Sequence, residues 1–439
     1  MSIFAENTKA QSLAQSLAQS LHSEDTGRCI IVDADAEKKL VRKIDLYLMP
    51  SIFILYLFSY MDRSNIGLAK IVGMEEDLHL TSHQYYTAVI VWVIGYTISA
   101  VPPNCDLLNF YMVSKERAVC LPISQWHSLE ILLIRSGSKR FIIFLTAGIL
   151  SGAFGGVISG AITSTLDGAQ GIRGWRWLFI VEWVATAGVS LIAHWTLLDY
   201  PHRSRGLSEE ERKLAQQRLV KDGIDQGDSK TQNTSMFILL LKALSNWRTW
   251  VLIPGYITLS GAGAISYFYP TLINDMGYTS INAQYMTVPL YIASMVAVVP
   301  ICWLADRKPL ARGQLLVGSM IVGMVFFALT AAIRNYIARY VFLCFINMTL
   351  WTGGALALSF ATTALASVTP DVRAIMLAWI PAAAALAQLY GSAPFPAEDS
   401  PGYVVGFSVF AATFAVGSVC HGLANILFKR LSLKGTYVP

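Results

Sequence analysis

Two neighbouring charged residues, Asp62 and Arg63, follow the first long apolar run of the sequence. That run, from Leu46 to Met61, is too short to cross a membrane, so a spanning helix has to continue to about Ala69. A charge at such a depth is costly unless it faces water, a partner or a ligand. Adjacent residues of a helix point about 100° apart, so the two charges do not simply neutralise each other.

Arg63 carries a planar guanidinium group with five N–H donors, which is suited to binding a carboxylate ligand. The alternative interpretation is a pair of interfacial charges that ends the helix. Glu182 is a second candidate, because it lies about seven residues after Trp175 and so roughly 10 Å into another apolar run. A carboxyl group there suits proton binding and release, and a structural pair with an arginine of another helix is an equally good interpretation.

Two tyrosines, Tyr267 and Tyr269, lie at a similar depth in a later apolar run. A tyrosine side chain stacks on a ligand and hydrogen-bonds to it. Tyrosines at such positions more often form a belt at the membrane surface, so both interpretations stay open here.

The composition indicates which solvent surrounds these residues. Hydrophobic residues make up 54% of the 439 residues and charged residues 14%, whereas soluble domains contain about 25% charged residues. A soluble protein of this length cannot hide so much apolar surface, so we expect lipid around most of the chain. The net charge of +5 is small and spread out, which gives no support for a nucleic-acid partner.

The sequence shows no pattern typical of an enzyme or of a cofactor site. The six cysteines have no C-x-x-C spacing, and no nucleophile elbow, metal-ligand cluster or phosphate-binding loop is recognisable. The cysteines are interpreted as small buried apolar residues. We therefore expect neither a metal nor a cofactor.

Hydropathy predicts an all-α membrane protein with about ten spanning helices. Between 105 and 138 the only apolar patch, 131–134, is too short to cross. The predicted spans are 45–69, 83–104, 139–166, 175–198, 247–273, 284–305, 313–334, 339–366, 372–392 and 402–428.

Charge placement predicts the topology of these spans. With the N-terminus inside, about 27 of the 33 lysines and arginines fall on cytoplasmic segments, so both termini are expected in the cytoplasm. The predicted parts are a disordered tail (1–44), a four-span bundle (45–199), a cytoplasmic linker (200–246), a six-helix bundle (247–430) and a second tail (431–439).

Two further patterns concern local structure. Ser208 and Glu211 have the spacing of a capping box, which predicts a short amphipathic helix from Glu209 to about Lys221. Its Leu214 is expected to rest on the membrane surface, or else to belong to a solvated linker helix. Glycines recur every four residues at 148, 152, 156 and 160, which predicts that this helix approaches another helix closely.

Several runs resemble those of the major facilitator superfamily, and within it the anion:cation symporters of the fungal allantoate permease type. Residues 61–67 (M-D-R-S-N-I-G) resemble the D-R-x-N-I-G run of these proteins, and residues 174–182 (G-W-R-W-L-F-I-V-E) their G-W-R-W-L-F-x-x-E run. Residues 267–271 (Y-F-Y-P-T) resemble their Y-F-x-P-T run. Residues 306–312 (D-R-K-P-L-A-R) resemble the D-R…R gating loop between helices 8 and 9.

The resemblance implies two pseudo-symmetric bundles around a central cavity with alternating access, and transport of a small organic anion or vitamin-like metabolite together with protons. It also implies a monomer in the plasma membrane, with the organic anion, protons and membrane lipid as its partners. The resemblance implies that Arg63 contacts the anion and that Asp306 and Arg307 belong to a gate. Together with the depth of the polar residues, the predicted site residues are Arg63, Asn65 and Tyr267 for substrate binding, Asp62 and Glu182 for proton coupling, and Asp306, Arg307 and Arg312 for gating.

The chain departs from the family in one region. Helices 3 and 4 are predicted to be missing or reduced between Cys105 and Ser138, which leaves about ten spans instead of twelve. In the family this region carries the first gating loop and, on helix 4, an arginine and a glutamate that serve substrate and proton. Export of a secondary metabolite, a shortened non-transporting sensor and an inactive relic are therefore the alternatives to proton-coupled uptake.

Overall fold

The computed structural model describes residues 34–100, 138–196, 208–214, 236–391, 394–395 and 397–433, and within these ranges the regular structure is entirely helical. The long helices are α2 (Ala34–Ala69), α4 (Ser82–Ala100), α7 (Ser138–Leu166), α8 (Gly174–Thr196), α11 (Trp247–Gly263), α13 (Ser280–Arg307), α14 (Arg312–Ala332), α15 (Tyr336–Ala364), α16 (Pro370–Ala385) and α18 (Val404–Leu433). The short elements are η1 (Lys70–Met74), α3 (Glu75–Asp77), η3 (Ala169–Gly171), α10 (Met236–Ser245), η4 (Ala264–Tyr267), α12 (Tyr269–Asn274), η5 (Pro309–Ala311), α17 (Gln388–Gly391) and η6 (Ala397–Asp399).

Eight helical segments of the described residues are long and apolar enough to cross a membrane, and each coincides with a predicted span. The two other predicted spans, 83–104 and 247–273, correspond to α4 and to the series α11, η4 and α12. The all-α, multi-pass class predicted from the sequence is therefore confirmed. The predicted loss of helices 3 and 4 concerns 101–137 and lies outside the described residues.

The chain divides into two compact units, of which the first comprises 1–48 and 198–227 and the second 49–197 and 228–439. In the first unit α2 already begins at Ala34, although 1–44 was expected to be a disordered tail. The residues from Ala34 to Arg42 are mostly strong helix formers. Leu40 adds a tertiary contact, because it is buried against Ile44 and Leu214.

The capping box is confirmed in this first unit. The Ser208 N–H donates to Glu211 Oε2 at 2.9 Å, and the Glu211 N–H donates to Ser208 Oγ at 3.2 Å. Glu211 also accepts from Lys43 Nζ, at 2.8 and 3.0 Å to its two oxygens. Leu214 thus packs on α2, a partner that neither of the two expectations for this residue had included.

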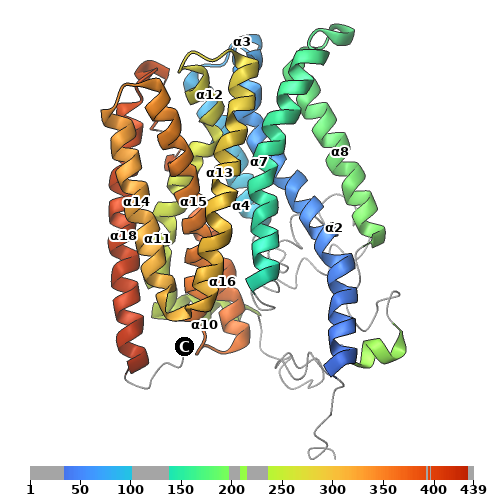
Figure 1. Ribbon diagram of the computed structural model, residues 1–439, viewed down its shortest axis with the longest axis vertical. Coiled ribbons are helices and arrows are strands. Elements are labelled where there is room, and N and C mark those ends of the chain that lie inside the picture. The colour runs from blue at the N-terminus through green and yellow to red at the C-terminus, as the bar shows by residue number, and fades with distance from the viewer. Residues whose placement is uncertain are drawn as a thin grey trace, which may run out of the picture. The chain divides into compact units, whose positions relative to one another are not determined.

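In the second unit the helices before and after the linker pack together. Figure 1 shows α7 running alongside α13, and α14 lying between α15 and α18. The glycine stripe of α7 explains the first of these contacts. A Cβ atom at Gly156 would lie 2.5 Å from Thr287 Oγ1, and one at Gly160 would lie 2.7 Å from the ring of Tyr285. The predicted close approach of this helix is therefore confirmed, and its partner is α13.

The Lys43–Glu211 pair generates a prediction for the first unit. Lys43→Glu should speed hydrogen exchange of 208–214 a few-fold, because it removes the ion pair but leaves both residues of the capping box in place, and exposed ion pairs contribute about 0.2–1 kcal/mol. Lys39→Glu is the matched control, because Lys39 is exposed one turn before Lys43. Equal exchange in the Lys43→Glu and Lys39→Glu variants would show that the pair contributes nothing.

The stabilising contribution of the Lys43–Glu211 pair should depend on pH. The hydrogen bond from Lys43 holds the pKa of Glu211 below its ordinary value. A lowered pKa means that the stabilising contribution is present at neutral pH and is lost as the pH falls through that lowered pKa.

Candidate transport site

Two faces of α2 carry the residues that the sequence singled out. Tyr56, Tyr60, Arg63 and Gly67 follow one another at spacings of four, three and four, which places them on one face of the helix. Asp62 points about 100° away from Arg63. A single helix therefore presents its cation and its anion to two different sets of neighbours.

The Arg63 face is aromatic. The guanidinium carbon of Arg63 lies 4.9 Å from the centroid of the Tyr60 ring. The Tyr60 ring in turn lies 5.5 Å from that of Tyr56 and 5.4 Å from that of Trp351, on α15. Arg63, Tyr56, Tyr60 and Trp351 are all half-buried. Arg63 is thus accessible at the edge of a group of rings that joins α2 to α15.

Two more tyrosines extend this group. Tyr291 of α13 lies within electrostatic range of Tyr60 and Tyr267, and the hydroxyl of Tyr267 donates to Gln388 Oε1 at 3.1 Å. We call Tyr56, Tyr60, Tyr267, Tyr291 and Trp351 the aromatic cluster. Tyr267 and Tyr291 are each only 6% exposed, so the interpretation of Tyr267 as part of a surface belt is wrong.

The glycine stripe of α7 makes room for the cluster. A Cβ atom at Gly148 would lie 2.9 Å from the Tyr56 ring and 3.2 Å from the Trp351 ring, and one at Gly152 would overlap the ring of Tyr291. Larger residues at these two positions would displace the rings. The stripe predicted to serve helix packing therefore also sets the positions of three aromatic side chains.

Asn347, one turn before Trp351 on α15, fixes the helices that carry the cluster. Its Nδ2 donates to the Leu290 carbonyl at 3.1 Å and to Ser294 Oγ at 2.8 Å, both on α13. Its Oδ1 accepts from the Tyr269 hydroxyl at 3.2 Å. Asn347 is buried and thus ties α12, α13 and α15 together next to the rings.

The other face of α2 meets α8. The hydroxyl of Thr186 lies 3.4 Å from Asp62 Oδ2, at the long limit of a hydrogen bond. Glu182, one turn before Thr186 on α8, is an electrostatic neighbour of Asp62. Glu182 is only 2% exposed, and neither of its carboxyl oxygens has a hydrogen-bond partner among the described residues. The two carboxyl groups predicted for proton coupling thus come together, and no described arginine pairs with Glu182.

Asn65 occupies a different place from the one expected of a substrate ligand. It is 1% exposed, and its Oδ1 has no hydrogen-bond partner among the residues that the structure describes. No described contact joins it to Arg63 or to the aromatic cluster. Its burial follows from its position on α2, because Asn65 points about 200° away from Arg63 around the helix.

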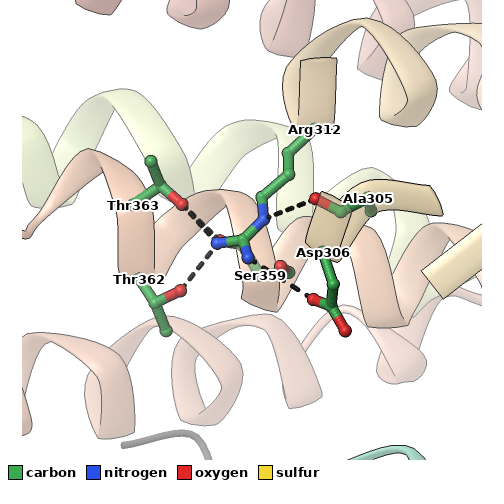
Figure 2. A network of polar contacts seen from close by, with 6 residues as sticks. All are labelled: Ala305, Asp306, Arg312, Ser359, Thr362 and Thr363. Atoms are coloured by element: carbon green, nitrogen blue, oxygen red, sulfur yellow. Dashed lines mark hydrogen bonds and ion pairs between the residues drawn. The ribbon is translucent and has the colours of Figure 1, made fainter. Parts of the chain in front are cut away.

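The predicted gating residues separate into two groups, and Figure 2 shows the group that contains Arg312 and Asp306. Arg312, at the start of α14, donates from Nε to the Ala305 carbonyl at 3.2 Å and from its terminal nitrogens to Thr363 Oγ1 at 2.7 Å and to Asp306 Oδ1 at 3.4 Å. It thus ties the end of α13 to the end of α15. Arg307 instead stacks on Trp303, with its guanidinium carbon 3.7 Å from the ring centroid.

Some residues of the site were not found from the sequence. Trp351, Tyr291 and Gln388 lie in predicted spans, where aromatic and amide side chains have no distinctive spacing. Asn347 did carry a signal, because an amide in the middle of an apolar span has to find hydrogen-bond partners.

Comparison with known proteins agrees with this fold. The chain matches the family model of the Major Facilitator Superfamily over residues 135–392. An uncharacterized transporter of Schizosaccharomyces pombe is 29% identical over 384 residues, which cover 78% of this chain and 77% of the relative. The MFS transporter prlL of a fungal species is 29% identical over 352 residues, 70% of each chain.

Two solved structures have a similar fold. A bacterial homologue of the human lysosomal transporter Spinster, in its inward-facing and unoccupied conformation, gives a TM-score of 0.57 at 12% identity and covers 88% of this chain and 98% of its own. A D-xylose–proton symporter gives 0.54 at 15% identity, over 88% and 97%. At these identities the likeness concerns the fold alone.

The chain therefore belongs to the major facilitator superfamily. It is a multi-pass membrane protein of a transporter family, which accords with the absence of an enzyme signature from its sequence.

The contact between Gly152 and Tyr291 generates a prediction for the site. Gly152→Ala should destabilise the protein by about 1–3 kcal/mol, because an added methyl group overpacks the interface. Gly354→Ala is the matched control, since a Cβ atom there meets nothing within 4 Å and alanine is the better helix former. The two variants are compared by thermal unfolding in detergent. If Gly152→Ala is as stable as Gly354→Ala, the glycine does not fix the ring.

Proposed function

We propose that this chain is a proton-coupled carrier of a small organic anion, of the anion:cation symporter type, that works by alternating access. The observation that supports it most is that two adjacent charged residues of α2, Arg63 and Asp62, face different neighbours. Arg63 faces the aromatic cluster and Asp62 faces Thr186 and the neighbourhood of Glu182. Anion and proton are then bound on two sides of the same helix.

Arg63 is the anion ligand in this proposal. A guanidinium group stacked on a ring keeps its N–H donors in its own plane, in the geometry that takes a carboxylate by two parallel hydrogen bonds. Tyr60 holds the group in this orientation. Tyr267 belongs to the same cluster, so we retain it as a substrate contact. Asn65 lies on another face of α2 and is not among the substrate contacts of this proposal.

Glu182 and Asp62 are the proton carriers. An ionised carboxyl group buried without a partner costs several kcal/mol, and binding a proton removes that cost. Glu182 fits this description, because both of its oxygens are buried and have no hydrogen-bond partner in the described part of the chain. Asp62 is exposed and lies within electrostatic range of Glu182, so it connects the buried carboxyl group to water.

The contacts of Arg312 support rigid-body movement of the helices after the linker. They join the ends of α13 and α15 to the start of α14. In this proposal Asp306 and Arg312 keep these helices together as one gate, and Arg307 with Trp303 lies at its edge. The carrier acts as a monomer in the plasma membrane, with the organic anion, protons and lipid as its partners.

Uptake into proteoliposomes tests the proposal. The full chain is reconstituted, and uptake of three hydrophilic carboxylates (para-aminohippurate, pantothenate and lactate) is measured with and without an inward proton gradient. We expect the gradient to accelerate uptake of at least one of them. Uptake of none, or uptake that is indifferent to the gradient, contradicts the proposal.

Single substitutions test the roles proposed for Glu182 and Arg63. Glu182→Gln should lose the acceleration by the gradient but still exchange labelled for unlabelled carboxylate, whereas Glu210→Gln, at an exposed glutamate of the linker, should behave like the parent. Arg63→Lys should weaken the apparent affinity, because it keeps the charge but not the planar fork. Arg63→Ala should abolish both uptake and exchange at normal protein abundance. An Arg63→Ala protein that carries solute like the parent would end the assignment.

A further inference from the structure

The rings next to Arg63 indicate the chemistry of the part of the anion that lies beyond its carboxylate. Tyr60 and Arg63 are three residues apart, which separates them by about 4.5 Å along the axis of α2. A ligand whose carboxylate pairs with Arg63 therefore has its next atoms beside Tyr60. Its remaining length runs toward Tyr56 and Trp351, whose rings contact Tyr60 and are likewise half-buried.

We propose that the anion is a planar aromatic monocarboxylate, whose ring stacks within the aromatic cluster while its carboxylate pairs with Arg63. This proposal rests on the function proposed above and names the class of its substrate. Aromatic pairs gain affinity beyond their buried area when the rings are offset-stacked or edge-to-face. The Tyr60 ring is tilted by 59° to that of Tyr56 and by 48° to that of Trp351, so a ligand ring that stacks on one of these rings meets the others at an angle.

The charges around the cluster favour one carboxylate rather than two. Arg63 is the one cation with a described contact to a ring of the cluster. The nearest described ionisable groups beyond it on α2 and α8 are Asp62 and Glu182, which would repel a second carboxylate if they were ionised. The tyrosine hydroxyls and the amide of Gln388, which are further polar groups that the structure describes at the rings, are neutral.

The aromatic cluster contains residues from the helices before the linker and from the helices after it. Tyr56 and Tyr60 lie before the linker, whereas Tyr291 and Trp351 lie after it. A ring bound among them contacts both groups at once, and such a ligand shifts the conformational equilibrium by its difference in affinity for the two states. The same contacts therefore select the substrate and couple its binding to movement.

Binding of two carboxylates of similar size tests the proposal. Benzoate and cyclohexanecarboxylate differ chiefly in the planarity and the π-system of the ring. Affinities are measured by isothermal titration calorimetry with the full chain in detergent at neutral pH. The parent should bind benzoate about tenfold more tightly than cyclohexanecarboxylate. Trp351→Phe should keep most of this preference, and Trp351→Leu should remove it.

Trp250→Leu is the control for loss of a tryptophan. Trp250 lies on α11, is 56% exposed and bonds to the Leu244 carbonyl outside the cluster, so this variant should keep the preference for benzoate. Equal affinity of the parent for the two probes, or a preference that survives Trp351→Leu, overturns the aromatic class but leaves an Arg63-dependent anion site standing. If Arg63→Ala binds both probes as the parent does, the proposed function fails as well.

Discussion

The placement of Asp62 and Arg63 next to each other on one membrane helix is the constraint on which the rest of the site depends. Two opposite charges one residue apart point about 100° away from each other, so each needs its own surroundings. The structure provides Tyr60 and its neighbouring rings for the cation, and α8 for the anion. A rotation or tilt of α2 therefore changes both surroundings together. This is the physical basis on which we propose that anion binding and proton binding are linked.

The arrangement needs helices that approach one another closely. The glycines of α7 leave room for Tyr291, Tyr56 and Trp351, and Asn347 ties α12, α13 and α15 together by three described hydrogen bonds. In lipid the hydrophobic effect does not drive helices together, so close packing and buried hydrogen bonds have to do so. Glu182 contrasts with Asn347, because its buried oxygens have no described partner. We interpret Asn347 as structural and Glu182 as functional on this ground.

Much of this was predictable from the sequence, because hydropathy and helical spacing act locally. The spans, the capping box at Ser208 and the glycine stripe follow from patterns that fix a structure without knowledge of its neighbours. The proximity of Asp62 to Glu182 was not predicted, because the depth of each residue does not tell which helices are neighbours. Trp351 was not predicted as a site residue, and the contact of Leu214 with α2 was not predicted either. Both roles depend on a partner far away in the chain, which no local pattern specifies. Among the gating residues, the contact of Arg312 with Thr363 has the same cause, because Thr363 lies on another helix. Arg307 instead has a local partner, Trp303, one turn away on its own helix.

The central claim is that anion binding at Arg63 and proton binding at Glu182 are coupled through α2, and linkage requires such a coupling to be reciprocal. The most direct measurement is the number of protons taken up when the best-transported carboxylate binds, obtained by isothermal titration calorimetry in buffers of different ionisation enthalpy. The account predicts proton uptake approaching one per anion in the parent, and close to none in Glu182→Gln with anion binding preserved. Anion binding without proton uptake in the parent, or unchanged uptake in Glu182→Gln, would contradict it.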